Sequence, residues 1–479
     1  MPQGGLAQLA RILVLFQDVC KLVSIEVASS CSFSSSTRSR SQPCRPDTIP
    51  AVAKHELSEL KTGERVISER VPGVRSVALG FWIGAGSRDE PDARAGVSHF
   101  IEHMLFKGSA RYSAQEIAEV FDELGGELNA ATSRETTVVY ARIPDDRLET
   151  ALDVMADMVY RPSFSELDSE REVVLEEIAM VEDTPHDLVH DIAAQAVFGG
   201  HALGRPVIGR ADVISSVTRR VMAGYHRRAY VGERLVVAAA GNVRHERLVD
   251  LLEERRNGAI SDVRLPTRKP VRRLPPPGLR FQRKDTEQYH VCLSAPGIAR
   301  TDERRFAASI LDAIVGGSAS SRLFQEIREK RGMAYSVYSY ASQYSDSGQV
   351  GLYVGTREEN LASCLEIAVT ELTDVAAGNV RREELARAKE NLKGRLLLSL
   401  ESTSNRMTRL GKATITGTPL HRIEHIVRRL EAVAAGEVAE LADELLAPGR
   451  LSAAGIGPDE GRFREAVARV NPALLEKAA

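Results

Sequence analysis

The sequence repeats one order of secondary structure in its two halves, and this repeat limits the fold more than any other feature. The stretch "RSVALGFWIGAGSRDEPDARAGVSHFIEHML" (75–105) predicts a strand, a glycine turn, an acidic loop and a helix. The stretch "QYHVCLSAPGIARTDERRFAASILDAIVGG" (288–317) predicts the same order. Each half then shows a helix–turn–helix pattern and a late strand, "RLVVAAAGNV" (234–243) in the first and "RLSAAGIGP" (450–458) in the second. Because 479 residues exceed what one hydrophobic core holds, we expect two similar domains.

The fold class that these patterns predict is α+β, with a mostly antiparallel sheet in each domain and helices on one face of it. We expect a first domain over 53–255, a linker over 256–279 that contains five prolines, and a second domain over 280–479. Residues 1–52 are rich in Ser and Arg, and we expect a disordered, low-complexity extension there. The alternative for this extension is a transit peptide. A secretory signal is not expected, because the apolar run is too short.

Composition excludes several classes of protein. Apolar residues make up 43% of the chain, charged residues 27%, and the net charge is -3, as in a soluble globular protein. This charge gives no reason to expect nucleic acid or a membrane as a partner. The five cysteines form no C-x-x-C pair, which favours a reducing compartment. We therefore expect a cytoplasmic protein, or one of an organellar matrix if the extension is a transit peptide.

The stretch "SHFIEHMLFKG" (98–108) predicts a metal site on a helix. His99 and His103 are four residues apart, so they share a helix face and can bind one zinc ion. Glu102 projects beside that face, where it can take a proton from a metal-bound water whose pKa zinc lowers to about 7. This is the inverted H-x-x-E-H motif of zinc peptidases. The alternative is a buried helix whose histidines are hydrogen-bonded core residues.

A third ligand is expected from the helix predicted over 165–183, within "SEREVVLEEIAMVED" (169–183). Glu170 and Glu177 are seven residues apart and share a face, so one can bind the metal while the other orients a ligand by hydrogen bonding. The residues alone do not choose between Glu170, Glu176 and Glu177, and a solvated acidic face is the alternative. Four apolar residues predict the core face of this helix: Val173, Val174, Ile178 and Val181.

The combination of "GVSHFIEHMLFKG" with "SEREVVLEEIAMVEDTP" resembles the pitrilysin/insulinase family of zinc metallopeptidases, which includes the catalytic subunits of mitochondrial processing peptidases and bacterial homologues. The resemblance extends over 55–460. It implies one zinc ion per chain, bound by His99, His103 and Glu177. It also implies that Glu170 orients this ligand set and that Glu102 is the general base.

Two further stretches match the same family. "GGELNAATSRETT" matches the strand on which members bind an extended peptide, with Asn129 and Ala130 at the contacting positions. "FQEIREKRGMAYSVYSY" matches the family's arginine–tyrosine pair, here Arg328 and Tyr335. The resemblance implies that this pair holds the substrate carbonyl and the developing oxyanion beside the zinc. Without the family, an ordinary hairpin and a surface role are the alternatives.

The resemblance implies a clamshell of four such domains around a closed chamber. Two domains make half of it, so we expect a homodimer in which Arg328 and Tyr335 serve the zinc site of the partner subunit. The expected function is a zinc-dependent endopeptidase acting on peptides or unfolded segments. The alternatives are a catalytic subunit that needs an inactive homologous partner and a non-catalytic scaffold. No glycine-rich substrate loop is evident, so presequence cleavage is not inferred.

A second histidine pair occurs in "TPHDLVHD", where His186 and His190 are again four residues apart. This pair has no glutamate at the place that glutamate takes in the H-x-x-E-H motif. We predict a solvated or interdomain face for this pair and no metal site.

Overall fold

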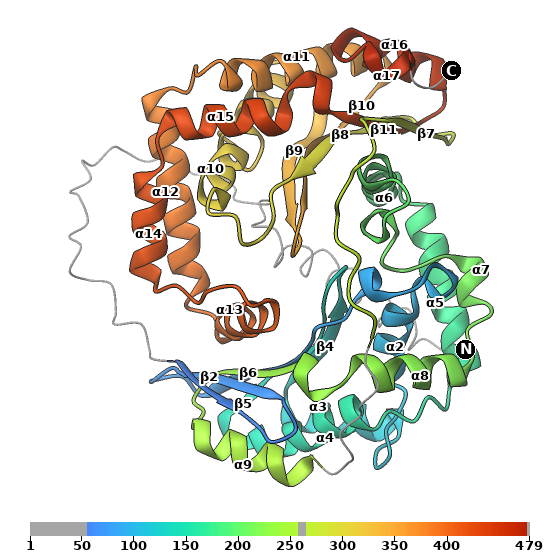
Figure 1. Cartoon of the computed structure of the whole chain (residues 1–479), viewed down its shortest axis with the longest axis vertical. Coiled ribbons are helices and arrows are strands. Elements are labelled where there is room, and N and C mark those ends of the chain that lie inside the picture. The colour runs from blue at the N-terminus through green and yellow to red at the C-terminus, as the bar shows by residue number, and fades with distance from the viewer. Residues whose placement is uncertain (1–54, 257–264, 477–479) are drawn as a thin grey trace.

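The structure, a computed structural model, describes residues 55–256 and 265–476. The predicted N-terminal extension and part of the predicted linker lie outside the described residues. Two β-sheets dominate the fold, and helices surround and join them (Figure 1). The strands of the first sheet come from the first half of the chain and those of the second sheet from the second half.

The first sheet has six strands in the order β1-β2-β6-β3-β5-β4. All neighbours are antiparallel except β2 and β6, which are parallel, and β4 lies at one edge. The strands are β1 (His55–Glu59), β2 (Arg65–Arg70), β3 (Ser76–Ile83), β4 (Glu127–Thr132), β5 (Thr137–Pro144) and β6 (Leu235–Gly241). The helices of this half are α2 (Val97–Leu105), α3 (Ala114–Leu124), α4 (Leu148–Tyr160), α5 (Leu167–Glu182), α6 (Pro185–Phe198), α7 (Ala211–Ile214), α8 (Arg219–Ala229) and α9 (His245–Arg255).

The second sheet has five strands in the order β7-β11-β8-β10-β9, with one parallel pair, β7 and β11. Its strands are β7 (Leu279–Arg283), β8 (Tyr289–Gly297), β9 (Ala334–Gln343), β10 (Gly348–Thr356) and β11 (Ser452–Gly457). Its helices are α10 (Arg305–Val315), a π-helical turn (Phe324–Glu329), α11 (Glu358–Ala376), α12 (Arg382–Ser399), α13 (Thr403–Thr416), α14 (Ile423–Ala432), α15 (Ala435–Leu446), α16 (Glu460–Val470) and α17 (Ala473–Glu476).

The two sheets share one topology, which confirms the predicted duplication and the α+β class. Strands β2, β6, β3, β5 and β4 correspond in order to β7, β11, β8, β10 and β9. The parallel pair falls at the same place in both sheets, and the corresponding strands β4 and β9 each lie at the edge of their sheet. Helix α10 therefore corresponds to α2, and α12 to α5.

Local sequence signals account for the helices near the predicted site. In α3, the Ser113 hydroxyl accepts the Glu116 N–H and the Glu116 carboxylate accepts the Ser113 N–H, while Gly125 ends the helix in a left-handed conformation. In α5, Val174 and Ile178 are buried as predicted and Val181 is partly buried in the core. The prediction was wrong for Val173, which is 38% exposed, because it lies outside the narrow buried stripe of this helix.

Each sheet is covered on its second face by a helix of the other half. Helix α13 packs against the first sheet, where Met407 and Leu410 contact Trp82 and its neighbours. Helix α6 packs against the second sheet through Val189 and Ile192. Figure 1 shows α13 beside β2 and β6, and α6 beside β7 and β11. Each sheet therefore has its own helices on one face, as the sequence predicts, and a helix of the other half on its second face.

The second histidine pair lies in one of these contacts, so the prediction of an interdomain face is confirmed. His190 Nε2 is 2.8 Å from the Tyr338 hydroxyl, and His186 Nε2 is 3.2 Å from the same hydroxyl. Tyr338 belongs to β9 of the second sheet. Burial, followed by the charge of His186, lowers the pKa of His190 to about 4, so this imidazole is neutral.

Two further findings concern the described residues as a whole. None of the helices in residues 55–256 and 265–476 combines the length and hydropathy that a membrane span requires. Cys292 and Cys364 are buried free thiols.

Candidate metal centre and active site

Helix α2 presents both histidines of the motif to one point. It begins after Gly96, whose φ of +95° is left-handed, and a Cβ there would lie 2.6 Å from the Ile208 carbonyl oxygen. His99 is 2% exposed, and its ring centroid is 4.7 Å from that of His103. The spacing of four residues therefore places the two imidazoles together, as the sequence predicts.

Helix α5 brings Glu177 to the same point. The Glu177 Oε2 atom lies 3.2 Å from His103 Nε2 and 3.6 Å from His99 Nε2. One ligand atom of each of the three residues lies within 4.8 Å of the others. In the part of the chain that the structure describes, this is the only such group of three or more His, Cys, Asp or Glu residues. Glu176, which the sequence left open as a ligand, is exposed.

Glu170 lies on the other side of His103. The His103 Nδ1 atom is 2.8 Å from Glu170 Oε1, and Lys107 Nζ is 2.7 Å from Glu170 Oε2. Although burial alone would raise it, hydrogen bonds from His103 and Lys107 hold the pKa of Glu170 below its usual value. An Nδ1–H donated to Glu170 turns the Nε2 atom of His103 toward Glu177, which is the orientation that metal binding at Nε2 needs. The sequence interpretation missed Lys107, whose signal is its position four residues after His103.

The two histidines differ in electrostatic environment. Burial lowers the pKa of His99 to about 4. Burial also acts against a charge on His103, but hydrogen bonds to Glu170 and Glu177 outweigh it and raise the pKa of His103 to about 10. The pKa of Glu177 is held low, since the charges of His99 and His103 outweigh its burial. Without a metal, His103 therefore keeps a proton between the two glutamates, and a metal ion bound at its Nε2 atom would replace that proton.

Unpartnered buried atoms test whether a metal ion fits this site. Among the described residues, Glu102 Oε2 is buried without a hydrogen-bond partner, and the nearby Glu177 Oε2 atom lies 3.2 and 3.6 Å from the two histidine Nε2 atoms. Buried polar atoms are rarely left so, and each such atom needs an explanation. Two imidazoles and a carboxylate are also the ligand set of many catalytic zinc sites. The residues present fit a zinc ion.

Glu102 lies beside the ligands and next to the end of β4. Burial raises the pKa of Glu102 to about 7, and the charge of His103 and hydrogen bonds from Thr132 act in the opposite direction. Thr132 is the last residue of β4. The carboxylate thus stands between the metal ligands and the edge of the first sheet, where it can exchange a proton with a bound molecule.

The predicted substrate strand, β4, has a free edge. It pairs with β5 on one side only. Ala130 is 8% exposed and packs into the core, whereas Asn129 is half-buried. The Asn129 Oδ1 atom accepts a hydrogen bond of 2.8 Å from the Ala130 N–H, so the side chain of Asn129 occupies a backbone donor of this strand. A peptide that pairs with this donor must displace Asn129.

Arg328 and Tyr335 lie together but apart from the ligands. The Arg328 guanidinium carbon is 4.7 Å from the ring centroid of Tyr335 and 4.7 Å from that of Phe324, so it is stacked between two aromatic rings. Arg328 lies on the π-helical turn, and Tyr335 is 79% exposed. No hydrogen bond or ion pair of the described residues joins the pair to His99, His103 or Glu177. The sequence interpretation missed Phe324, which precedes Arg328 by four residues.

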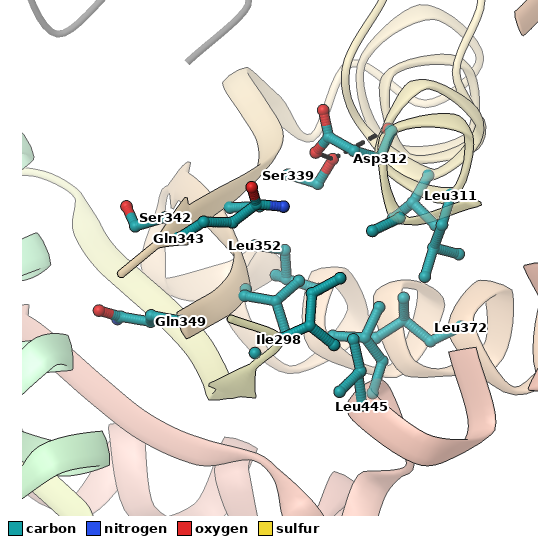
Figure 2. A pocket seen from close by; sticks show the side chains of 17 residues that line it. Ile298, Leu311, Asp312, Ser339, Ser342, Gln343, Gln349, Leu352, Leu372 and Leu445 are labelled. Atoms are coloured by element: carbon teal, nitrogen blue, oxygen red, sulfur yellow. Dashed lines mark hydrogen bonds between the residues drawn. The ribbon is translucent and has the colours of Figure 1, made fainter. Parts of the chain in front are cut away.

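The second domain has an apolar pocket where the repeat would place a second metal site. Figure 2 shows Leu311, Leu372 and Leu445 lining it beside strands of the second sheet. The only carboxylate in its lining is Asp312, whose Oδ1 atom accepts a hydrogen bond of 2.6 Å from Ser339. Burial raises the pKa of Asp312 to about 6, against this hydrogen bond. The pocket thus offers no cluster of metal-binding groups.

This combination of a duplicated α+β fold, a buried H-x-x-E-H helix and a glutamate from a later helix defines the class of inverted-motif zinc peptidases. The chain belongs to the insulinase family, peptidase family M16. The model of that family, insulinase (peptidase family M16), matches residues 65–211, and the model described as peptidase M16 inactive domain matches residues 216–392.

Curated relatives cover most of the chain. An uncharacterized zinc protease of Streptomyces coelicolor is 41% identical over 85% of this chain and 92% of the relative. One of Mycobacterium tuberculosis is 42% identical over 87% of this chain and 96% of its own. The uncharacterized zinc protease YmxG of Bacillus subtilis is 40% identical over 80% of this chain and 94% of its own.

Solved structures agree in fold. A protease from Helicobacter pylori superimposes with a TM-score of 0.80 at 21% identity, over 85% of this chain and all of that chain (100%). A peptidase M16 inactive domain from Pseudomonas fluorescens gives a TM-score of 0.79 at 22% identity, over 85% of this chain and 98% of that one. At these identities the likeness concerns the fold alone.

Proposed function

We propose that this protein is a zinc-dependent endopeptidase that hydrolyses peptides or unfolded segments in a dimeric chamber. The observation that carries the proposal is the convergence of His99, His103 and Glu177 beside the unpartnered carboxylate of Glu102. The printed names of the curated relatives, zinc proteases, support the same chemistry. A cytoplasmic location and the division into domains over 53–255 and 280–479 belong to the same proposal.

One zinc ion per chain would be held by Nε2 of His99, Nε2 of His103 and a carboxylate oxygen of Glu177. When bound, it supplies Lewis acidity, which lowers the pKa of a coordinated water to about 7 and polarises a carbonyl group. Glu170 holds His103 in the tautomer that such binding needs, through the 2.8 Å contact with Nδ1.

The other residues bind the peptide and move a proton. The free edge of β4 orients an extended peptide by backbone hydrogen bonds, which accept any sequence. Asn129 and Ala130 contribute to this edge, once the Asn129 side chain has left the Ala130 N–H. Glu102 takes a proton from the attacking water and returns it to the nitrogen of the leaving amine.

We propose a homodimer in which Arg328 and Tyr335 complete the site of the other subunit by holding the carbonyl oxygen of the substrate. The exposure of Tyr335 and the stacking of Arg328 between two rings support a role at a surface that another molecule covers. The alternatives are pairing with an inactive homologue and a non-catalytic scaffold role.

The experiment that tests the function uses the purified full chain. Zinc content per chain is measured beside cleavage of a quenched fluorescent peptide, before and after removal of zinc by a chelator. We expect about one zinc per chain, as in catalytic sites with three protein ligands, and cleavage that is lost with zinc and restored with it. A chain that holds zinc but cleaves nothing supports the partner-dependent alternative. A chain that binds no zinc supports the scaffold.

Mixing two inactive variants tests the shared site. Glu102→Gln and Tyr335→Phe each disable both sites of a homodimer. A mixed dimer holds one intact site, formed by Glu102 of one subunit and Tyr335 of the other. After subunit exchange at equal concentrations we expect recovery of about a quarter of the wild-type activity, since half of the dimers are mixed. Unchanged, residual activity on mixing would contradict a site shared between subunits.

Removal of the Glu170 carboxylate tests its proposed role. We expect Glu170→Gln to weaken zinc binding by about 10- to 100-fold, as is typical when a group that orients a metal ligand is lost. Zinc affinity is measured by competition with a chromophoric chelator. Glu172→Gln, which changes an exposed glutamate on the same helix, is the matched control. Equal zinc affinity in the two variants would refute the role.

A further inference from the structure

Three consecutive residues between β3 and α2 contact three different parts of the molecule. Arg88, Asp89 and Glu90, which we call the relay turn, follow one another at the end of a 3₁₀ turn. Arg88 contacts the second domain, Asp89 contacts the linker, and Glu90 contacts the helix that carries the two histidines. All three residues are buried or nearly so.

Glu90 caps α2. Its Oε2 atom accepts a hydrogen bond of 2.7 Å from the Gly96 N–H, and its Oε1 atom accepts one of 2.7 Å from the Ser98 N–H. These donors belong to the unsatisfied N–H groups at the start of the helix, and a carboxylate there also interacts favourably with the helix dipole. Gly96 has no side chain with which to make such a cap. His99 is the residue that follows Ser98.

Burial of the Glu90 carboxylate is unfavourable for its charged form. Glu90 is 5% exposed, and its burial raises the pKa of Glu90 to about 7 against the hydrogen bonds from Ser98 and Gly96. Arg205 fixes the turn from outside, since its Nη2 atom donates to the Glu90 carbonyl oxygen at 2.7 Å and to that of Ser87 at 3.0 Å. The position of the Glu90 carboxylate, and with it the first turn of α2, therefore depends on where the relay turn lies.

The other two residues of the relay turn belong to a buried network of charges, the interdomain lock. Arg88 donates to Asp346 of the second domain at 2.7 and 2.8 Å. Arg268 of the linker donates to Asp89 at 2.9 and 2.8 Å. Glu135 of the first domain accepts from both Arg88 and Arg300. The members of the lock are Arg88, Asp89, Glu135, Arg268, Arg300 and Asp346.

The energetics of buried ion pairs indicate what such a network does. Charges taken out of water pay a desolvation cost that pairing only offsets, so a buried network adds little stability but penalises every arrangement in which a charge loses its partner. The side chains of Arg88, Glu135 and Asp89 are 1%, 2% and 0% exposed. Displacement of the second domain relative to the first would therefore take Asp346 from Arg88 and Arg300 from Glu135, and Arg88 would have to share the remaining carboxylate of Glu135 inside the first domain.

We propose that Glu90 is a positioning residue for the metal site and that the relay turn couples the interdomain lock to the histidine helix. The arrangement of the two domains and the linker then sets the geometry of His99 and the affinity for zinc. The proposal rests on zinc binding at this site, as proposed above. It adds a coupling between domain arrangement and metal affinity.

The test is a double-mutant cycle on the full chain, read out as zinc affinity by chelator competition. We expect Glu90→Gln to weaken zinc binding by about 10- to 100-fold. Asp346→Asn breaks the lock in the other domain and should weaken zinc binding by about 2- to 30-fold, the range of coupling between separate sites. In the Glu90→Gln background, Asp346→Asn should have no further effect. An equal effect in both backgrounds, or a change below twofold in the wild type, overturns the coupling.

Amide hydrogen exchange in the zinc-free chain gives a second readout that needs neither metal nor activity. We expect faster exchange at Gly96 and Ser98 in both Glu90→Gln and Asp346→Asn. Glu444→Gln, which breaks an exposed ion pair with Arg304 inside the second domain, should leave these amides unchanged. Faster exchange spread evenly over the chain means general destabilisation and overturns the proposal.

The two readouts separate the possible failures. If the wild type binds no zinc, the proposed function fails, and the amide exchange still decides the coupling. If Glu90→Gln does not fold, Asp346→Asn can still be tested, because Asp346 is partly exposed. Amide exchange at Gly96 and Ser98 in that variant then decides whether the coupling exists.

Discussion

Glu102→Gln is expected to lower peptide hydrolysis by about 10²- to 10⁴-fold, the usual contribution of a positioned general acid–base group. The amide keeps the size of the side chain but cannot accept the proton of the attacking water. The Glu102 Oε2 atom has no hydrogen-bond partner among the described residues, so the substitution removes no internal hydrogen bond at that atom. Zinc content should stay at the wild-type value, because His99, His103 and Glu177 remain.

Activity on a quenched fluorescent peptide and zinc per chain are measured in the same samples. Glu123→Gln, an exposed glutamate on α3, is the control and should match the wild type in both. Full activity of Glu102→Gln in zinc-replete protein would exclude Glu102 as the base. Loss of zinc together with activity would show instead that the carboxylate holds the metal.

Glu177→Gln is expected to abolish both zinc binding at micromolar free zinc and hydrolysis. The carboxylate lies within 3.6 Å of both histidine Nε2 atoms, and without it only the two imidazoles remain as ligands. Two ligands do not make a catalytic zinc site. We expect a loss of more than about 100-fold in zinc affinity, beyond the loss typical of a group that only orients a ligand.

The matched control is Glu176→Gln, which removes an adjacent but exposed carboxylate from the same helix. Chelator competition and total zinc analysis are run on both variants, and the melting temperature of the zinc-free chains checks folding. Retention of about one zinc per chain in Glu177→Gln would contradict a three-ligand site. It would return Glu170 or Glu176 to consideration.

Local periodicity accounts for most of what the sequence predicts about the site. His99 and His103 meet because an α-helix brings residues four apart together, and that geometry needs no tertiary information. The duplication could also be predicted, since the residue pattern of each half indicates the order of its strands and helices. The third ligand could not be chosen from the residues. The rotation of α5 against α2 decides whether Glu170, Glu176 or Glu177 faces the histidines, and the sequence does not show that rotation.

Features that depend on the path of a loop or on contacts distant in sequence were missed. Glu90 reaches the start of α2 through a loop whose path no periodicity predicts. The reciprocal packing of α6 and α13 depends on the arrangement of two whole domains, so the sequence predicted only the helices that cover their own sheet. Val173 was misplaced for a simpler reason, since an apolar residue beside a buried one looks like core in a sequence.

The exchange of α6 and α13 has the form of a domain-swapped dimer that has been joined into one chain. Each half gives the other a helix that covers its open sheet face. Within one chain, the linker keeps the effective concentration of the two halves high, so this exchange does not depend on protein concentration. Each half has its own main apolar core, but one face of each sheet is covered only by the other half, so we expect the two halves to unfold together.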